Sequence, residues 1–302
     1  MSLLILDTDP GVDDALALLY LRARNQQKWP DLKLLAITTV FGNADVETTT
    51  RNALWLRARL GLSAPVYRGA AEPLTRPRGL SPKHVHGENG LGDLDLSGAP
   101  LSPAGSGAAH ERIIDLVRAR PREITIVAIG PLTNLALALR AAPDVAGLVA
   151  GVTIMGGAFA AGNVTPFAEA NIHNDPEAAA EVLAAPWPVT LVPLDATMSC
   201  VLTNAKAGEL AQQGEAGRFA HDITRGYAKA YERLDGCVLH DVAALVSLTR
   251  PELFETRVAP VSVATSGERL GQTAWGEDGP AVSVRLRADG AALARHFRET
   301  VA

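Results

Sequence analysis

Residues 3–19 of the chain read Leu-Leu-Ile-Leu-Asp-Thr-Asp-Pro-Gly-Val-Asp-Asp-Ala-Leu-Ala-Leu-Leu. The apolar run over residues 3–6 predicts a buried strand, and Pro10-Gly11 predicts a turn soon after it. Strong helix formers follow from Ala15 onward, so the stretch predicts a strand, a turn and a helix in succession. In open α/β sheets, ligands bind at such strand ends.

Four aspartates gather at this predicted strand end: Asp7, Asp9, Asp13 and Asp14. Carboxylates that close cannot all stay ionised unless a cation compensates them, and a hard divalent cation held by oxygen ligands does so most simply. The alternative is that Asp13 only caps the helix while the other acids face solvent. Four acids joined by a Pro-Gly turn favour the cation site.

Composition restricts the class of protein. Of the 302 residues, 47% are hydrophobic and 20% are charged, which is typical of a globular chain, and we expect one α/β domain over residues 1–302. A net charge of −5 without a basic block argues against nucleic acid or an anionic membrane as partner. Two cysteines and a short apolar start without basic residues favour a cytoplasmic protein.

The rest of the chain continues the alternation of strands and helices. Buried strands are expected at 32–40, 66–67, 124–128, 152–155, 189–194, 258–263 and 282–286. Helices are expected at 13–24, 45–60, 108–120, 203–234 and from 289 onward, and residues 68–108 are expected to form a loop. This order predicts an α/β fold with a mostly parallel, Rossmann-like central sheet flanked by helices.

Several motifs resemble those of the nucleoside hydrolases, the inosine–uridine-preferring nucleoside N-ribohydrolases. Residues 7–15, Asp-Thr-Asp-Pro-Gly-Val-Asp-Asp-Ala, match the family's opening motif without a departure. Similar elements are Gly-Pro-Leu-Thr-Asn at 130–134, the Asn- and Glu-containing segment at 162–177, and Leu-His-Asp at 239–241. The resemblance implies the nucleoside hydrolase fold, Ca²⁺-dependent hydrolysis of ribonucleosides in purine or pyrimidine salvage, and a homo-oligomer, dimer or tetramer.

The resemblance also implies a set of metal ligands: Asp9, Asp14, the backbone carbonyl of Ile129, and Asp241. Asp9 is expected to take a proton from the attacking water, and His240 to assist the departing base. The transition state is expected to resemble an oxocarbenium ion. From the residues alone, a His-Asp pair at a helix start is usually a cap.

Further residues are expected to bind the substrate: Asp13, Asn43, His86, Asn163, Glu169, Asn171, Tyr227 and Tyr231. Amide and carboxylate groups suit the vicinal hydroxyls of ribose. Asp175-Pro176 starts a helix, which leaves the three residues within 163–171 without a helical role. From the residues alone, an exposed loop position for His86 fits equally well. Tyr227 and Tyr231 are spaced to share one helix face, and such a pair is more commonly a pair of core aromatics.

Other functions share part of this pattern. A hydrolase of a modified N-riboside, or a ribose- or nucleoside-binding protein without catalysis, would carry the same polar residues. A Mg²⁺-dependent phosphotransferase also uses strand-end acids, but the second acidic pair after Pro10-Gly11 fits it poorly. The sequence does not indicate the preferred base. Ser199 stands where many relatives carry His, so no contact of that loop is carried over.

Overall fold

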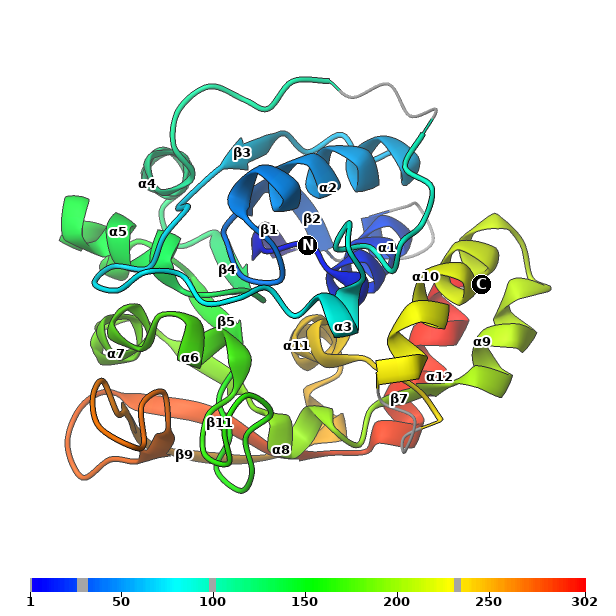
Figure 1. Ribbon diagram of the computed structural model, residues 1–302. Helices are drawn as coiled ribbons and strands as arrows, with labels where there is room; N and C mark the ends of the chain where they lie inside the picture. The colour runs from blue at the N-terminus through cyan, green and yellow to red at the C-terminus, as the bar shows by residue number, and fades with distance from the viewer. Residues whose placement is uncertain (1, 26–31, 98–101, 231–234) are drawn as a thin grey trace.

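The computed structural model describes residues 2–25, 32–97, 102–230 and 235–302. A nine-stranded sheet runs through this part of the chain in the order β10-β9-β11-β6-β5-β4-β1-β2-β3 (Figure 1). Its strands are β1 (Ser2–Thr8), β2 (Leu32–Thr39), β3 (Val66–Arg68), β4 (Ile124–Ala128), β5 (Gly151–Met155), β6 (Val189–Val192), β9 (Phe254–Val263), β10 (Thr273–Trp275) and β11 (Ala281–Ala288). All neighbours from β3 to β11 pair in parallel, and β9 and β10 add antiparallel pairs at one edge. The predicted α/β fold with a mostly parallel sheet is confirmed.

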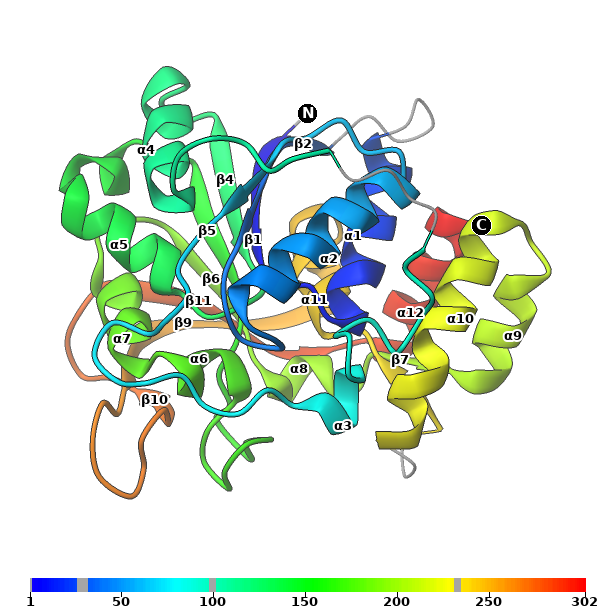
Figure 2. The ribbon, with the colours of Figure 1, turned by 45° about the horizontal axis from the view of Figure 1, so that its top comes forward.

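Helices cover both faces of this sheet (Figure 2). They are α1 (Val12–Asn25), α2 (Val46–Arg59), α3 (Lys83–His86), α4 (Ala109–Ala119), α5 (Thr133–Ala141), α6 (Ala170–Asn174), α7 (Pro176–Ala184), α8 (Leu194–Thr197), α9 (Asn204–Ala211), α10 (Glu215–Ala230), α11 (His240–Thr249) and α12 (Gly290–Val301). A small antiparallel pair, β7 (Val201–Thr203) with β8 (Gly236–Val238), lies beside α9 and α10. No helix among the described residues is long and apolar enough to span a membrane.

The interior strand β1, between β4 and β2, shows why two layers of helices form. Successive side chains of a strand point to opposite faces. Leu4 and Leu6 therefore pack into the core lined by α1, α2, α10, α11 and α12, whereas Leu3 and Ile5 pack against α4, α5 and α7. A strand buried on both faces reads as a continuous apolar run, which is the pattern of residues 3–6.

Several predicted boundaries are corrected by the structure. Strand β1 continues through Thr8, so the first acid of the motif lies within the sheet. The strand expected at 189–194 ends at Val192, because Pro193 has no N–H for the sheet and the chain turns into α8. The loop expected at 68–108 contains the short helix α3, and the helical region expected at 203–234 is two helices, α9 and α10.

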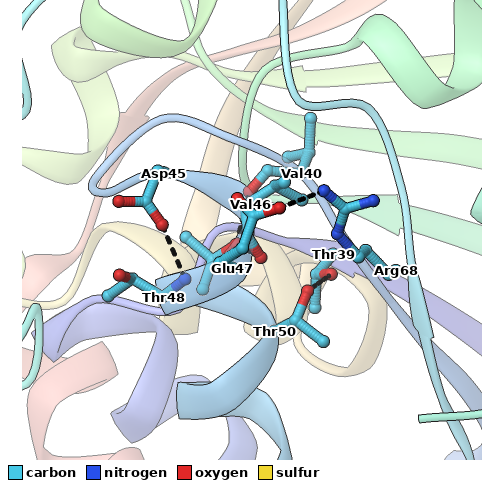
Figure 3. Close-up of polar contacts among 9 residues, drawn as sticks. Thr39, Val40, Asp45, Val46, Glu47, Thr48, Thr50 and Arg68 are labelled. Carbon is cyan, nitrogen blue, oxygen red and sulfur yellow. Dashed lines mark hydrogen bonds and ion pairs between the residues drawn. The ribbon is translucent and has the colours of Figure 1, made fainter.

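Helix α2 is fixed to the carboxyl ends of β2 and β3 by side chains (Figure 3). Asp45 caps α2 by accepting a hydrogen bond from the Thr48 amide at 2.8 Å. Thr39 at the end of β2 shares a 2.7 Å hydrogen bond with Thr50 of α2, and an exposed ion pair joins α2 to β3. These contacts fix the 40–45 turn, which lies directly over the acidic end of β1.

Asp175 joins three segments of the site's periphery and is fully buried. As predicted from sequence, it caps the helix that starts at Pro176: its Oδ1 accepts from the Ala178 amide at 3.1 Å. Its Oδ2 accepts from the Leu74 amide at 2.9 Å and from the Thr133 hydroxyl at 2.7 Å. One carboxylate thus ties α7, the 69–82 segment and the start of α5 together.

Replacing Asp175 by Ala is expected to lower the free energy of unfolding by about 2–4 kcal/mol, because it removes a cap and leaves the buried Thr133 hydroxyl and the half-buried Leu74 amide without their acceptor. Urea unfolding measures the loss. The matched control is Asp289→Ala, which removes a cap on α12, the 3.0 Å bond to the Ala292 amide, and should cost about 1 kcal/mol. Equal losses in the two variants would contradict the linking role of Asp175.

Candidate active site

Four buried carboxylates meet where β1 ends, α1 begins and α11 begins: Asp9, Asp13, Asp14 and Asp241. Among the described residues, Asp13, Asp14 and Asp241 each offer one oxygen, and these oxygens lie within 4.8 Å of one another. Asp241 is more than 220 residues from the other three acids in the sequence. It lies beside them in the structure because α11 packs against α1. The cluster has the ligand chemistry of a hard-cation site.

Neighbouring hydrogen bonds fix two of these carboxylates. Asp14 accepts from the Thr8 hydroxyl and from the Gly11 amide, the latter at 2.8 Å. Asn43, in the turn after β2, donates its backbone N–H to Asp9 Oδ2 at 2.7 Å and a side-chain Nδ2–H to Asp14 Oδ2 at 3.2 Å. In this structure Asn43 therefore orients Asp9 and Asp14. The sequence predicted Asn43 as a substrate-binding residue and did not indicate these contacts.

Three carboxylate oxygens in this region are buried and have no hydrogen-bond partner among the described residues: Asp7 Oδ2, Asp9 Oδ1 and Asp13 Oδ1. A buried acceptor left unpaired costs about 1–3 kcal/mol or more, so these oxygens favour a bound cation or hydroxyl. Gly130 leaves room beside one of them: a Cβ there would lie 2.6 Å from Asp9 Oδ1. The residues present fit a divalent cation.

Burial dominates the protonation of these acids. It raises the pKa of Asp7 to about 7 and of Asp13 to about 8. The pKa values of Asp9 and Asp241 lie well above the ordinary value, first through burial and then through neighbouring carboxylates. Burial also raises the pKa of Asp14, against the hydrogen bond from Thr8. Without a cation the cluster therefore retains protons at neutral pH, and a cation would displace them.

The carbonyl of Ile129 follows β4, as expected for a backbone ligand, and accepts a hydrogen bond from Asn171 Nδ2 at 3.1 Å. The same Nδ2 donates to the Met155 carbonyl at 3.1 Å, so Asn171 connects the ends of β4 and β5. A carbonyl oxygen has two lone pairs, which leaves the Ile129 oxygen one further acceptor position. Asn171 is buried, with 8% of its surface exposed.

Glu169 has a helical role, so the expectation that it has none is wrong. It caps the short helix α6, accepting from the amides of Asn171 at 2.8 Å and Ile172 at 3.1 Å, and it also accepts from Gly157 at 2.9 Å. Its charge nevertheless reaches the cluster, where it raises the pKa values of Asp13 and Asp241. Asn163 is exposed, and its Oδ1 accepts from the Ala170 amide at 3.0 Å, just beside this cap.

Two buried histidines stand near the carboxylates. His86 lies on α3, its Nδ1 accepts from the Val12 amide at 3.2 Å, and it makes an edge contact with Tyr227, the ring centroids 6.1 Å apart. The alternative interpretation of His86 as an exposed loop residue is therefore wrong. His240 begins α11, and burial lowers its pKa to about 4. Burial, followed by the charge of His240, lowers the pKa of His86 to about 3.

Of the two expected aromatic contacts, Tyr227 is buried in α10 beside His86, whereas Tyr231 lies outside the described residues. Sequence reasoning missed some supporting polar residues. Asn52 of α2 donates to the carbonyls of Pro10 and Asn89, at 3.2 and 3.0 Å, and so links the acidic turn to the segment after α3. An Asn inside an otherwise apolar helical face was the one available signal.

Thr273 is a second missed residue, in a region where the sequence showed no chemistry. Its hydroxyl accepts from the Ala158 amide at 2.9 Å and donates to the Ala158 carbonyl at 2.8 Å. The Phe159 ring stacks on Trp275 at 4.3 Å between centroids. The β9–β10 edge thereby supports the loop that leads to Glu169.

This constellation of buried acids and histidines at the strand ends of an α/β sheet has counterparts in known proteins. Residues 4–295 match the family described as inosine-uridine preferring nucleoside hydrolase, and the chain belongs to that family. It is accordingly a nucleoside hydrolase, an enzyme that cleaves N-glycosidic bonds of ribonucleosides.

Individual relatives are similar over nearly their whole length. The chain is 39% identical to uridine nucleosidase 1 of Arabidopsis thaliana over 276 residues, which covers 89% of this chain and 80% of the relative. It is 37% identical to the non-specific ribonucleoside hydrolase RihC of Salmonella agona over 311 residues, covering 99% and 96%. Among solved structures, the plant nucleoside hydrolase PpNRh1 has a TM-score of 0.94 at 32% identity, with 99% and 98% of the chains covered. The purine-preferring ribonucleoside hydrolase from Gardnerella vaginalis has a TM-score of 0.91 at 33% identity, with the same coverage.

Proposed function

We propose that this nucleoside hydrolase uses Ca²⁺ and one water to convert a ribonucleoside into ribose and the free base. The observation that carries the proposal is the gathering of Asp13, Asp14 and Asp241 beside unpaired buried oxygens of Asp9 and Asp13. Such a group of acids is unfavourable in the absence of a cation. We further propose that the enzyme is a homo-oligomer of two or four copies and acts in the cytoplasm.

Asp9, Asp14, Asp241 and the Ile129 carbonyl would hold the cation, since carboxylates mixed with a backbone carbonyl suit Ca²⁺. When bound, the cation supplies a water of lowered pKa and positive charge beside the sugar. Asp13 lies close enough to belong to the ligand set. We assign it to the ribose hydroxyls, because its unpaired Oδ1 is an acceptor for an O–H donor.

The residues of the chain then divide the reaction between them. Asp9 takes a proton from the attacking water while the oxygen of that water bonds to C1′ of ribose. The C1′–N bond breaks, and its electron pair leaves with the base. His240 donates a hydrogen bond to the departing base, which gains one proton overall. Asn163, Glu169 and Asn171 orient the ribose, and the negative charge of Glu169 favours the oxocarbenium-like ring.

The base itself would lie near His86 and Tyr227, a polar and an aromatic side chain that touch one another. Relatives of this chain are named for uridine, for purines and for non-specific hydrolysis. The preferred base is therefore a question for the assay.

Release of reducing sugar from uridine, cytidine, inosine and adenosine, with and without a chelator, tests the proposal. Ribose release that is abolished by chelation and restored by Ca²⁺ is the expected result. Hydrolysis that persists after complete removal of divalent cations would overturn the calcium requirement. Tight nucleoside binding without turnover would indicate a nucleoside-binding protein without catalysis. Turnover of modified ribosides alone would indicate a hydrolase of a modified N-riboside.

A further inference from the structure

The ring of His240 is held from one side by a buried hydroxyl. Thr197 Oγ1 lies 2.7 Å from His240 Nδ1, and both residues are buried, at 0% and 5% exposed. Among the described residues, the hydrogen bonding of this ring is confined to Nδ1 and this hydroxyl. Nε2 is therefore the ring nitrogen left for a substrate.

The hydroxyl belongs to α8, a four-residue helix that packs beside α11 (Figure 1). The same helix holds the loop before Glu169: Asp195 accepts from the backbone amides of Phe159 at 2.8 Å and Ala160 at 3.0 Å. A single short element thus contacts both the histidine and the segment that carries the expected ribose ligands. The position of Thr197 is fixed by these contacts together with the hydrogen bonds that close α8.

We propose that Thr197 is a positioning residue. Its hydroxyl donates a hydrogen bond to His240 Nδ1, and this keeps the proton of the imidazole ring on Nε2, facing the leaving base. This inference rests on the proposed role of His240 in hydrolysis. A neutral imidazole carries one N–H, so an O–H donor at Nδ1 places that N–H at Nε2. The tautomer with the proton on Nδ1 would present a lone pair to the departing base and repel its developing charge.

The second histidine of the site shows the same arrangement with an unambiguous donor. The Val12 backbone N–H can only donate, so His86 Nδ1 accepts and the ring proton lies on Nε2. In both rings Nδ1 is the nitrogen that contacts a hydrogen-bonding partner from the protein. At His240 the donor is a side chain, and it can be removed by substitution.

Thr197→Val removes the hydroxyl and keeps the shape of the side chain. We expect kcat/KM for the best nucleoside to fall by about 10- to 100-fold, mainly in kcat, because the N–H is no longer oriented. A p-nitrophenyl riboside needs no help at its leaving group, since p-nitrophenolate is stable without a donor, so its kcat/KM should change less than about threefold. Thr197→Ser, which restores the hydroxyl, should recover most of the nucleoside activity.

The matched control is Ser199→Ala, two residues along the chain, which removes an exposed hydroxyl that donates to the backbone carbonyls of Ala196 and Ala288 and lies 3.9 Å from Cys200 Sγ. It should leave both substrates unaffected. A Thr197→Val enzyme that hydrolyses nucleosides at the rate of the unaltered protein would overturn the inference, as would equal losses on both substrates. If the unaltered protein hydrolyses neither substrate, the proposed function itself fails.

Nitrogen-15 chemical shifts of the His240 ring test the tautomer without any turnover. The unaltered protein should show the proton on Nε2, and Thr197→Val should show a mixture of the two tautomers. The resonance is assigned by its loss in His240→Gln. A proton on Nδ1 in the unaltered protein would overturn the inference whether or not Thr197→Val folds.

Discussion

Replacing Asp9 by Asn is expected to lower kcat/KM for the best nucleoside by at least about 1000-fold, because one substitution removes both the proposed base and a proposed metal ligand. The oxygen of the new amide can still accept the 2.7 Å hydrogen bond from the Asn43 backbone. Its NH₂ group then takes the place of Oδ1, the buried oxygen without a partner, and it can neither accept a proton nor bind a cation. Initial rates of ribose release at saturating Ca²⁺ measure the loss.

The matched control for this variant is Asp45→Asn, an Asp-to-Asn change at the exposed N-cap of α2 (Figure 3). Asn is as good a helix cap as Asp, so α2 should keep its capping bond and kcat/KM should stay within about twofold. Asp9→Asn should also unfold at no lower temperature than the unaltered protein without cation, since a buried carboxyl is removed. An Asp9→Asn enzyme that keeps a tenth or more of the activity would contradict the assignment.

Local sequence patterns predicted the fold well. The apolar run before Asp7 indicated a strand buried on both faces, and it forms an interior strand of the sheet, between β4 and β2. The helix former after the Pro-Gly turn, and Asp175 before Pro176, marked two helix starts that the structure confirms. These features succeed because turns, caps and apolar periodicity act within a few residues of the chain.

The supporting contacts were not predictable, because their partners lie far apart in sequence. Thr197 and His240 are 43 residues apart, and Asp175 contacts an amide 101 residues away. Nothing local distinguishes a threonine that contacts a buried histidine ring from one that faces solvent. Glu169 was misjudged for a related reason: its cap serves a helix of five residues, too short to leave an apolar period in the sequence. The expected ligand roles remain predictions, since ligand binding depends on groups outside the chain.

Calcium is expected to stabilise the protein more at alkaline than at acidic pH. The pKa of Asp13 is raised by burial from 3.8 to about 8, and that of Asp7 from 3.8 to about 7. A carboxyl whose pKa is higher in the folded state contributes stability below its unfolded pKa and loses it as the pH rises to its folded pKa. Between pH 7 and 8, Asp13 alone should cost the cation-free protein about 1 kcal/mol.

The two buried histidines do not change the stability between pH 7 and 8. Their folded pKa values of about 3 and 4 are depressed from 6.5, so their contribution is lost only as the pH falls below about 6.5. A cation at 1,000 times its dissociation constant adds about 4 kcal/mol, and less at low pH, where it must displace protons. Thermal unfolding should therefore show a calcium-induced rise of roughly 5–10 °C at pH 8.5 and a smaller one at pH 6. Asp241→Asn should unfold at a higher temperature than the unaltered protein without cation at pH 8.5, and it should lose most of the calcium response. An equal calcium effect at both pH values would show that the carboxylates are already ionised at pH 6, contrary to the raised pKa values that their burial produces.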